Sequence, residues 1–182
     1  MTKWIIGLAV AVWASAAVAQ FYGHQAPTGR ASNDEPVDPN AAESPLKYPA
    51  APNEAGLVSF FVSAGSPHRF MVDADSVSVE KEGVVRYTLV IQASGGARNV
   101  SYEGMRCATA ERRTYAFGKA DGSWSPTRTS GWSKIREAEV NRQHAALYQE
   151  YFCPGGVIVR SVDEVRRLLR AGGEKQHGTP GR

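Results

Sequence analysis

Cysteine is scarce in this sequence, and its scarcity excludes several kinds of site. The chain has 182 residues and two cysteines, Cys107 and Cys153. They form no Cys-x-x-Cys motif, and no local motif couples either cysteine to a histidine, which argues against a reactive thiol. Neither cysteine lies near the N-terminal apolar run, so we do not expect the acylated cysteine of a bacterial lipoprotein.

Strong net charge is also lacking. The formal net charge is +3, which argues against a general nucleic-acid binder. Beyond the N-terminal run, no apolar stretch reaches the length of about 20 residues that a membrane-spanning helix needs. We therefore expect no nucleic-acid partner and no membrane span after removal of that run.

Catalytic motifs are absent as well. The four histidines, His24, His68, His144 and His177, show no metal-ligand spacing. There is no Gly-x-Ser-x-Gly and no glycine-rich phosphate loop. We therefore predict no metal, no cofactor and no catalytic residue.

The N-terminus has the three parts of a secretory signal peptide, predicted over residues 1–19. Lys3 supplies a positive charge, an apolar run follows, and Ala17-Val18-Ala19 offers small residues for cleavage. Cleavage after Ala19 predicts a periplasmic protein that is neither membrane-bound nor a lipoprotein. The alternative is a retained membrane anchor, for which the run is slightly short.

Export bears on whether the two cysteines form a disulfide. In an oxidising compartment a pair of thiols usually forms a disulfide, so we predict a Cys107–Cys153 bond.

The chain ends differ in composition from its centre. Residues 20–56 contain six prolines and few apolar side chains, which predicts a disordered linker that can be removed without unfolding the rest. Residues 172–182 are rich in glycine and predict a flexible tail. A single domain is expected over residues 57–171.

Short apolar and alternating segments predict a meander of strands. The strand candidates are residues 57–62, 70–72, 77–80, 84–92, 97–107, 111–118 and, later, 157–159. A turn is expected at residues 73–76, and glycines at positions 95 and 96 indicate a hairpin. In the clearest strand, 84–92, Val85 and Tyr87 are expected to face the core and Arg86 the solvent. By similar reasoning, Tyr102 is expected to point inward.

Two helices are predicted after the strands. Residues 138–152 lack glycine and proline and carry apolar side chains, with His144 among them, at helical spacing. Ser161 and Glu164 form a capping box for a second helix, which Gly172 ends. The whole predicts an α+β fold: an antiparallel β-meander sheet with one or two C-terminal helices packed on it and one disulfide.

Basic and aromatic side chains gather between residues 98 and 136, and arginine and tryptophan are enriched at binding hot spots. We predict Arg112, Arg113 and Trp124 as binding residues, because a cation beside an exposed indole suits anionic or sugar-bearing ligands. The alternative is that Trp124 folds back onto the sheet and the arginines pair with Glu103 or Glu111.

Several stretches carry a resemblance to a known family. They are Gly83-Val84-Val85-Arg86-Tyr87-Thr88-Leu89-Val90-Ile91, Asn99-Val100-Ser101-Tyr102-Glu103-Gly104-Met105-Arg106-Cys107 and Tyr151-Phe152-Cys153-Pro154. Together they resemble the CNP-one-like family of exported proteobacterial proteins. The resemblance implies an envelope location and assigns no catalytic residue.

Two functions from different classes remain. The first is a non-catalytic periplasmic binding or accessory domain, whose partner is an envelope protein or an anionic or sugar-bearing envelope ligand. The second is an enzyme acting on an envelope component through dispersed residues, with His144, Glu103 and Tyr102 as candidates.

Overall fold

The computed structural model describes residues 41–129, 131–136 and 142–173. These residues belong to one compact unit, Pro36–Arg182. The predicted signal peptide, the first half of the predicted linker and residues 174–182 of the predicted tail lie outside the described residues.

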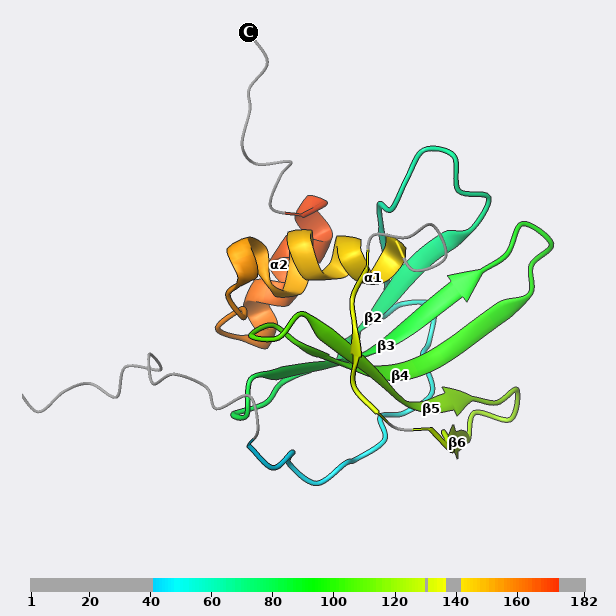
Figure 1. Cartoon of the computed structure of the whole chain (residues 1–182). Helices are drawn as coiled ribbons and strands as arrows, with labels where there is room; N and C mark the ends of the chain where they lie inside the picture. The colour runs from blue at the N-terminus through cyan, green and yellow to red at the C-terminus, as the bar shows by residue number, and fades with distance from the viewer. Residues whose placement is uncertain (1–40, 130, 137–141, 174–182) are drawn as a thin grey trace, which may run out of the picture. The chain divides into compact units, whose positions relative to one another are not determined.

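A seven-stranded antiparallel sheet forms the centre of the described chain, with neighbouring strands in sequence order β1-β2-β3-β4-β5-β6 and β7 paired with β5 (Figure 1). Its strands are β1 (Leu57–Phe60), β2 (Arg69–Val79), β3 (Val84–Gln92), β4 (Arg98–Arg106), β5 (Glu111–Gly118), β6 (Trp124–Pro126) and β7 (Ser133–Lys134). The predicted meander is confirmed. The two shortest strands, β6 and β7, were not predicted.

Two helical segments cover one face of this sheet (Figure 1). The first comprises α1 (Arg142–Ala146), the π-helical turn η2 (Leu147–Phe152) and the short 3-10 turn η3 (Pro154–Gly156). The second is α2 (Val162–Ala171). The α+β fold class is therefore confirmed, although the strand predicted at residues 157–159 is wrong. Residues 138–141 of the predicted first helix lie outside the described chain.

The ends of α2 follow the sequence signals. The Ser161 side chain accepts a hydrogen bond from the backbone N–H of Glu164, and the Glu164 carboxylate accepts one from the N–H of Arg160. Gly172 has a φ of 86°, a left-handed conformation that glycine adopts without strain.

The core lies between the sheet and the helices. Val85, Tyr87 and Leu89 of β3 face Leu147 and Phe152 of η2, and all five are at most 1% exposed. The inward direction predicted for Val85 and Tyr87 is confirmed.

The turn predicted at residues 73–76 is wrong, because β2 passes through it as one strand with a shift of register between Asp73 and Ser78. The Ser76 hydroxyl donates to the Asp73 carbonyl (2.7 Å) and accepts from the Thr88 N–H (2.8 Å). These bonds replace regular ladder bonds at the irregularity, so the strand continues.

The other face of the sheet is also covered, which the sequence did not predict. Arg86 was expected to face solvent but is 2% exposed, and Tyr102, opposite Thr88 in the strand register, lies on this second face rather than in the helix-side core. What covers them is the end of the predicted linker, since residues 41–56 run along this face (Figure 1). The folded part therefore begins earlier than residue 57.

The disulfide between Cys107 and Cys153 is present, as predicted. It joins the end of β4 to the end of η2 across a separation of 46 residues, and both cysteines are at most 3% exposed. The bond therefore ties the helical layer to the sheet within the core.

We expect replacement of both cysteines, Cys107→Ala with Cys153→Ala, to lower the free energy of unfolding by about 2–5 kcal/mol, since a long loop is no longer closed. Urea unfolding of the oxidised wild type and of the variant measures the difference. Equal unfolding free energies would show that the bond adds nothing to the stability of this fold.

Candidate functional site

Residues 43–49, which we call the strap, are held on the sheet by directed polar contacts, beginning with Glu43. Its carboxylate accepts hydrogen bonds from Arg113 Nη1 (2.5 Å), the Tyr115 hydroxyl (2.7 Å) and Trp132 Nε1 (3.1 Å). Burial and this bond raise the pKa of Tyr115. One carboxylate thus gathers donors from β5 and from the segment before β7.

Arg86 of β3 holds the next part of the strap. Its Nη2 donates to the Ser44 carbonyl (2.7 Å) and to Glu82 (3.2 Å), and its Nη1 donates to the Pro45 carbonyl (3.3 Å). Glu82 in turn accepts from the N–H and hydroxyl of Ser44 at 2.8 and 2.6 Å. Burial opposes ionisation of Glu82, but the bonds from Ser44 lower its pKa overall.

Aromatic contacts fix the far end of the strap. The Tyr48 ring stacks on Trp124 and meets Tyr102 edge-on, with centroids 6.2 and 6.1 Å apart. Trp124 Nε1 donates to the Pro49 carbonyl at 2.8 Å. The strap is therefore bound at both ends without joining the sheet as a strand.

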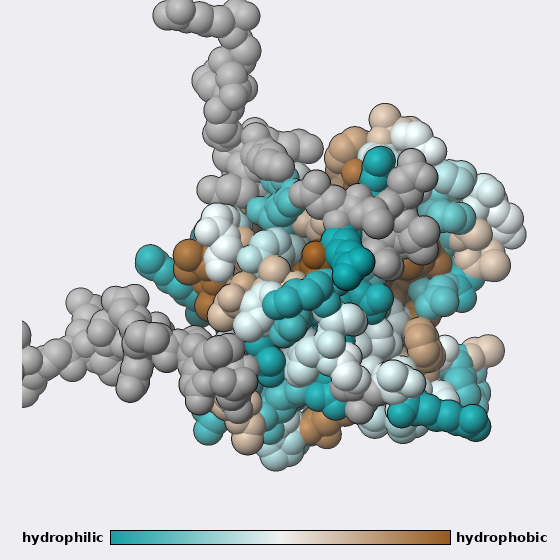
Figure 2. Space-filling model, viewed as in Figure 1, coloured by the Kyte–Doolittle hydropathy of each residue, from teal (hydrophilic) through white to brown (hydrophobic). Residues whose placement is uncertain are grey.

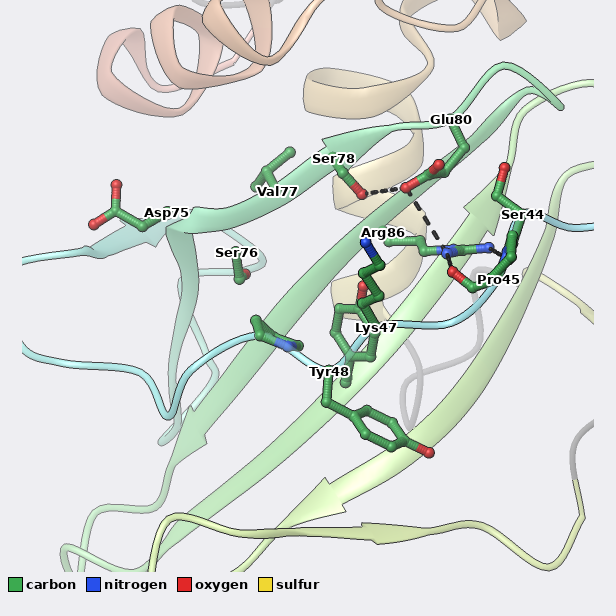
Figure 3. A pocket seen from close by; sticks show the side chains of 12 residues that line it. Ser44, Pro45, Lys47, Tyr48, Asp75, Ser76, Val77, Ser78, Glu80 and Arg86 are labelled. Carbon is green, nitrogen blue, oxygen red and sulfur yellow. Dashed lines mark hydrogen bonds and ion pairs between the residues drawn. The ribbon is translucent and has the colours of Figure 1, made fainter.

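A pocket of about 560 Å³ opens between the strap and β2 (Figure 3). The strap forms one wall of this pocket, β2 forms the other, and β3 and β4 form its floor. The strap supplies Ser44, Pro45, Lys47, Tyr48 and Pro49; β2 supplies residues 75–78, with Glu80 just beyond it; β3 and β4 supply Arg86 and Tyr102.

Several polar groups of the pocket keep bonding capacity. The Lys47 side chain extends from the strap toward β2 (Figure 3). The Tyr102 hydroxyl has no hydrogen-bond partner in the described chain, and burial raises its pKa, so it stays protonated. Glu80 accepts one bond, from the Ser78 hydroxyl at 2.7 Å. The pocket thus offers both donors and acceptors.

The three predicted binding residues do not share one surface. Arg113 bonds Glu43 and Trp124 contacts the strap, whereas Arg112 pairs in register with Met105 and lies on the helix side, with Thr114 Oγ1 3.3 Å from its Nη1. A register shift in β5 places Tyr115, buried, on the strap side. Trp124 therefore folds back onto the sheet, as the alternative held, and the partner of Arg113 is Glu43.

The three residues of the enzyme alternative are separated too. Tyr102 lies on the strap side, whereas Glu103 and His144 meet inside the helix-side core, each 4% exposed. Glu103 accepts from His144 Nε2 (2.7 Å), from Ser101 (2.7 Å) and from the Tyr87 hydroxyl (3.1 Å). His144 Nδ1 has no partner among the described residues.

Electrostatic interactions determine the protonation states in the buried cluster of Glu103, His144 and Tyr87. Burial favours the neutral acid of Glu103, but His144 and the hydrogen bonds it receives lower the pKa of this carboxyl overall. Since an ionised carboxylate only accepts hydrogen bonds, Nε2 of His144 carries the proton that it donates. The same environment raises the pKa of Tyr87 well above its ordinary range. The cluster is closed to solvent by burial.

Sequence reasoning missed the residues that build the pocket. Glu43 and Lys47 fell in the predicted linker, and Arg86 was assigned to solvent. One signal was available: Arg86 sits in the middle of the most apolar strand, where an unpaired charge is costly and a partner is required.

The fold and the site define a class: a single-disulfide α+β domain whose sheet carries helices on one face and a bound N-terminal strap on the other. The family model of the CNP1-like family matches residues 37–170, so the chain belongs to this family. The match includes the strap. No curated protein and no solved structure matches the chain.

None of the helices in the described part of the chain is long and apolar enough to cross a membrane, and the described residues contain no cluster of side chains able to hold a metal ion.

We expect Glu43→Ala to loosen the strap, because it leaves Arg113, Tyr115 and Trp132 without their shared acceptor. The free energy of unfolding should fall by about 1–3 kcal/mol, and hydrogen exchange at the Ser44 amide should accelerate. Glu54→Ala is the control, since its side chain is 78% exposed. Unchanged exchange at Ser44 would show that Glu43 does not hold the strap.

We expect Glu103→Gln to lower the free energy of unfolding at pH 7 by about 3–5 kcal/mol, as for a broken buried pair. The folded-state pKa of Glu103 is lowered, so its contribution is present above the ordinary value near 4.5 and is lost as the pH falls through the folded-state pKa. The difference between wild type and variant should therefore shrink below about pH 4.5.

Urea unfolding between pH 7 and pH 3 measures this pH dependence, with Glu54→Gln as the matched control on an exposed carboxylate. A difference that stays constant over the whole range would mean that the ionised form of Glu103 is not the stabilising one.

Proposed function

We propose that this chain is an exported, non-catalytic binding domain of the periplasm, and that its ligand occupies the pocket between the strap and β2. The observation that carries the proposal is the lining of that pocket. Lys47, Tyr102 and Glu80 keep unused donors and acceptors beside the carbon surfaces of Pro45 and Pro49. Convergent polar groups within a partly apolar cavity are typical of ligand sites.

Two features support export. Residues 1–19 have the pattern of a secretory signal peptide, and the buried Cys107–Cys153 bond suits an oxidising compartment. An accessory role fits this location, because a domain of this kind presents a ligand or partner without transforming it.

The enzyme alternative rests on the bond between Glu103 and His144, which resembles a base held by an orienting carboxylate. Their position argues against it, since both side chains are 4% exposed and lie in the core beneath the helices, where a substrate does not reach the base; the equally buried Tyr102 borders the strap pocket instead. Tyr102, the third candidate, belongs to the pocket on the opposite face.

The proposal is tested with the full chain expressed in a bacterium with a periplasm. We expect the protein in the periplasmic fraction, beginning at Gln20. Equilibrium dialysis against low-molecular-mass envelope extract, followed by mass spectrometry, should then show a compound concentrated by the protein. Lys47→Met should lose this retention.

Lys119→Met is the matched control, because this lysine lies in the turn between β5 and β6, outside the pocket. Retention that Lys47→Met leaves unchanged would overturn the assignment of the pocket, and a compound recovered with altered covalent mass would favour the enzyme. Recovery of the chain only from the cytoplasm would overturn export.

A further inference from the structure

The charges around the pocket narrow the class of ligand, and this step rests on the function proposed above. Lys47, Arg86, Asp75 and Glu80 line the cavity, but the Asp75 carboxylate points away from the strap and pairs with Arg166 of α2 at 3.5 Å (Figure 3). Arg86 is paired with Glu82 at 3.2 Å, so the charges that face the cavity are one cation, Lys47, and one anion, Glu80. A ligand with a large net charge of either sign meets repulsion as well as attraction here.

Arg86 offers little to an anionic ligand although it lies in the floor. Its two terminal nitrogens already donate to the strap carbonyls and to Glu82, and its Nε is buried from solvent. The fork geometry that would bind a carboxylate or a phosphate in bidentate fashion is therefore occupied. Lys47 remains as the accessible cation of the lining, and Glu80 lies on the opposite wall.

The groups that remain open alternate between donors and acceptors. Lys47 and the Tyr102 hydroxyl donate, whereas the Glu80 carboxylate accepts. A ligand hydroxyl both donates and accepts, so neighbouring hydroxyls of one molecule satisfy such a lining with no net charge. Ser78 adds a further acceptor on the same wall (Figure 3).

Carbon surfaces lie between these polar groups. The lining includes the rings of Pro45 and Pro49 and the side of the Tyr102 ring. A molecule with an apolar face and hydroxyls around its edge matches this pattern. Figure 2 shows apolar residues scattered among hydrophilic ones on its visible face, so no wide apolar surface competes there as a docking site.

We propose that the pocket binds an uncharged saccharide unit, with its hydroxyls bonded to Lys47, Tyr102 and Glu80 and its C–H face packed on Pro45 and Pro49. The strap completes this site, because it supplies one whole wall. Glu43 therefore acts as a positioning residue: it holds the strap in place and contacts no ligand.

The test is a titration of the ¹⁵N-labelled protein with uncharged N-acetylglucosamine and glucose, and with the anionic glucuronate and cationic glucosamine as comparisons. We expect at least one uncharged sugar to shift the amide signals of Lys47, Ser78 and Glu80, and the charged sugars to bind more weakly. Equal or tighter binding of glucuronate would overturn the assignment to an uncharged ligand.

Variants then locate the site. Tyr102→Phe keeps the buried ring and removes only the hydroxyl, so it should weaken binding about three- to ten-fold. Lys47→Met should weaken it similarly, whereas Lys119→Met and Phe61→Ala, an exposed aromatic outside this pocket, should not. Glu43→Ala should weaken binding together with faster exchange at Ser44. Binding that Tyr102→Phe and Lys47→Met leave unchanged would overturn the site.

The outcome separates this inference from the function on which it rests. If no sugar binds while dialysis still yields a compound that Lys47→Met fails to retain, the saccharide assignment is wrong and the binding function stands. If neither sugars nor extract give binding at this pocket, both are wrong.

Discussion

Arg86 is a cation buried on a sheet face, and the strap side of the structure depends on satisfying it. An isolated buried charge is strongly unfavourable, so it needs partners close by. Glu82 lies 3.2 Å from the guanidinium, with Glu80 and Glu43 at 3.8 and 3.9 Å. The remaining hydrogen bonds of the guanidinium go to strap carbonyls. The strap therefore replaces part of the water that would otherwise solvate this charge.

This requirement explains why an extended, proline-containing segment is ordered at all. Such a segment has little apolar surface with which to offset its ordering entropy. The strap is instead held by Glu43 and Ser44 at one end and by Tyr48 and Pro49 at the other, through bonds to side chains of β3, β5 and β6. Since the same segment forms one wall of the pocket, the ion cluster and the proposed ligand site are mechanically linked.

The two faces of the sheet therefore differ in chemistry. The helix side is an apolar core that the disulfide cross-links, and it contains Glu103 and His144 as a buried polar pair. The strap side is built from charges, hydroxyls and rings that are partly open to water. A site able to exchange a polar ligand is consistent with the second face, whereas the first is suited to holding the fold together.

Local patterns in the sequence determined the parts of the fold that depend on neighbouring residues. The alternation around Tyr87 predicted β3, Ser161 with Glu164 predicted the start of α2, and the two cysteines predicted their bond. These signals are short-range or, for the cysteines, chemically unique. Tertiary structure alone decided the rest: that Arg86 is buried, that Glu43 reaches Arg113, and that Tyr102 faces the strap. Each depends on a register shift or on a contact between segments about 40 or more residues apart, for which spacing along the chain carries no signal.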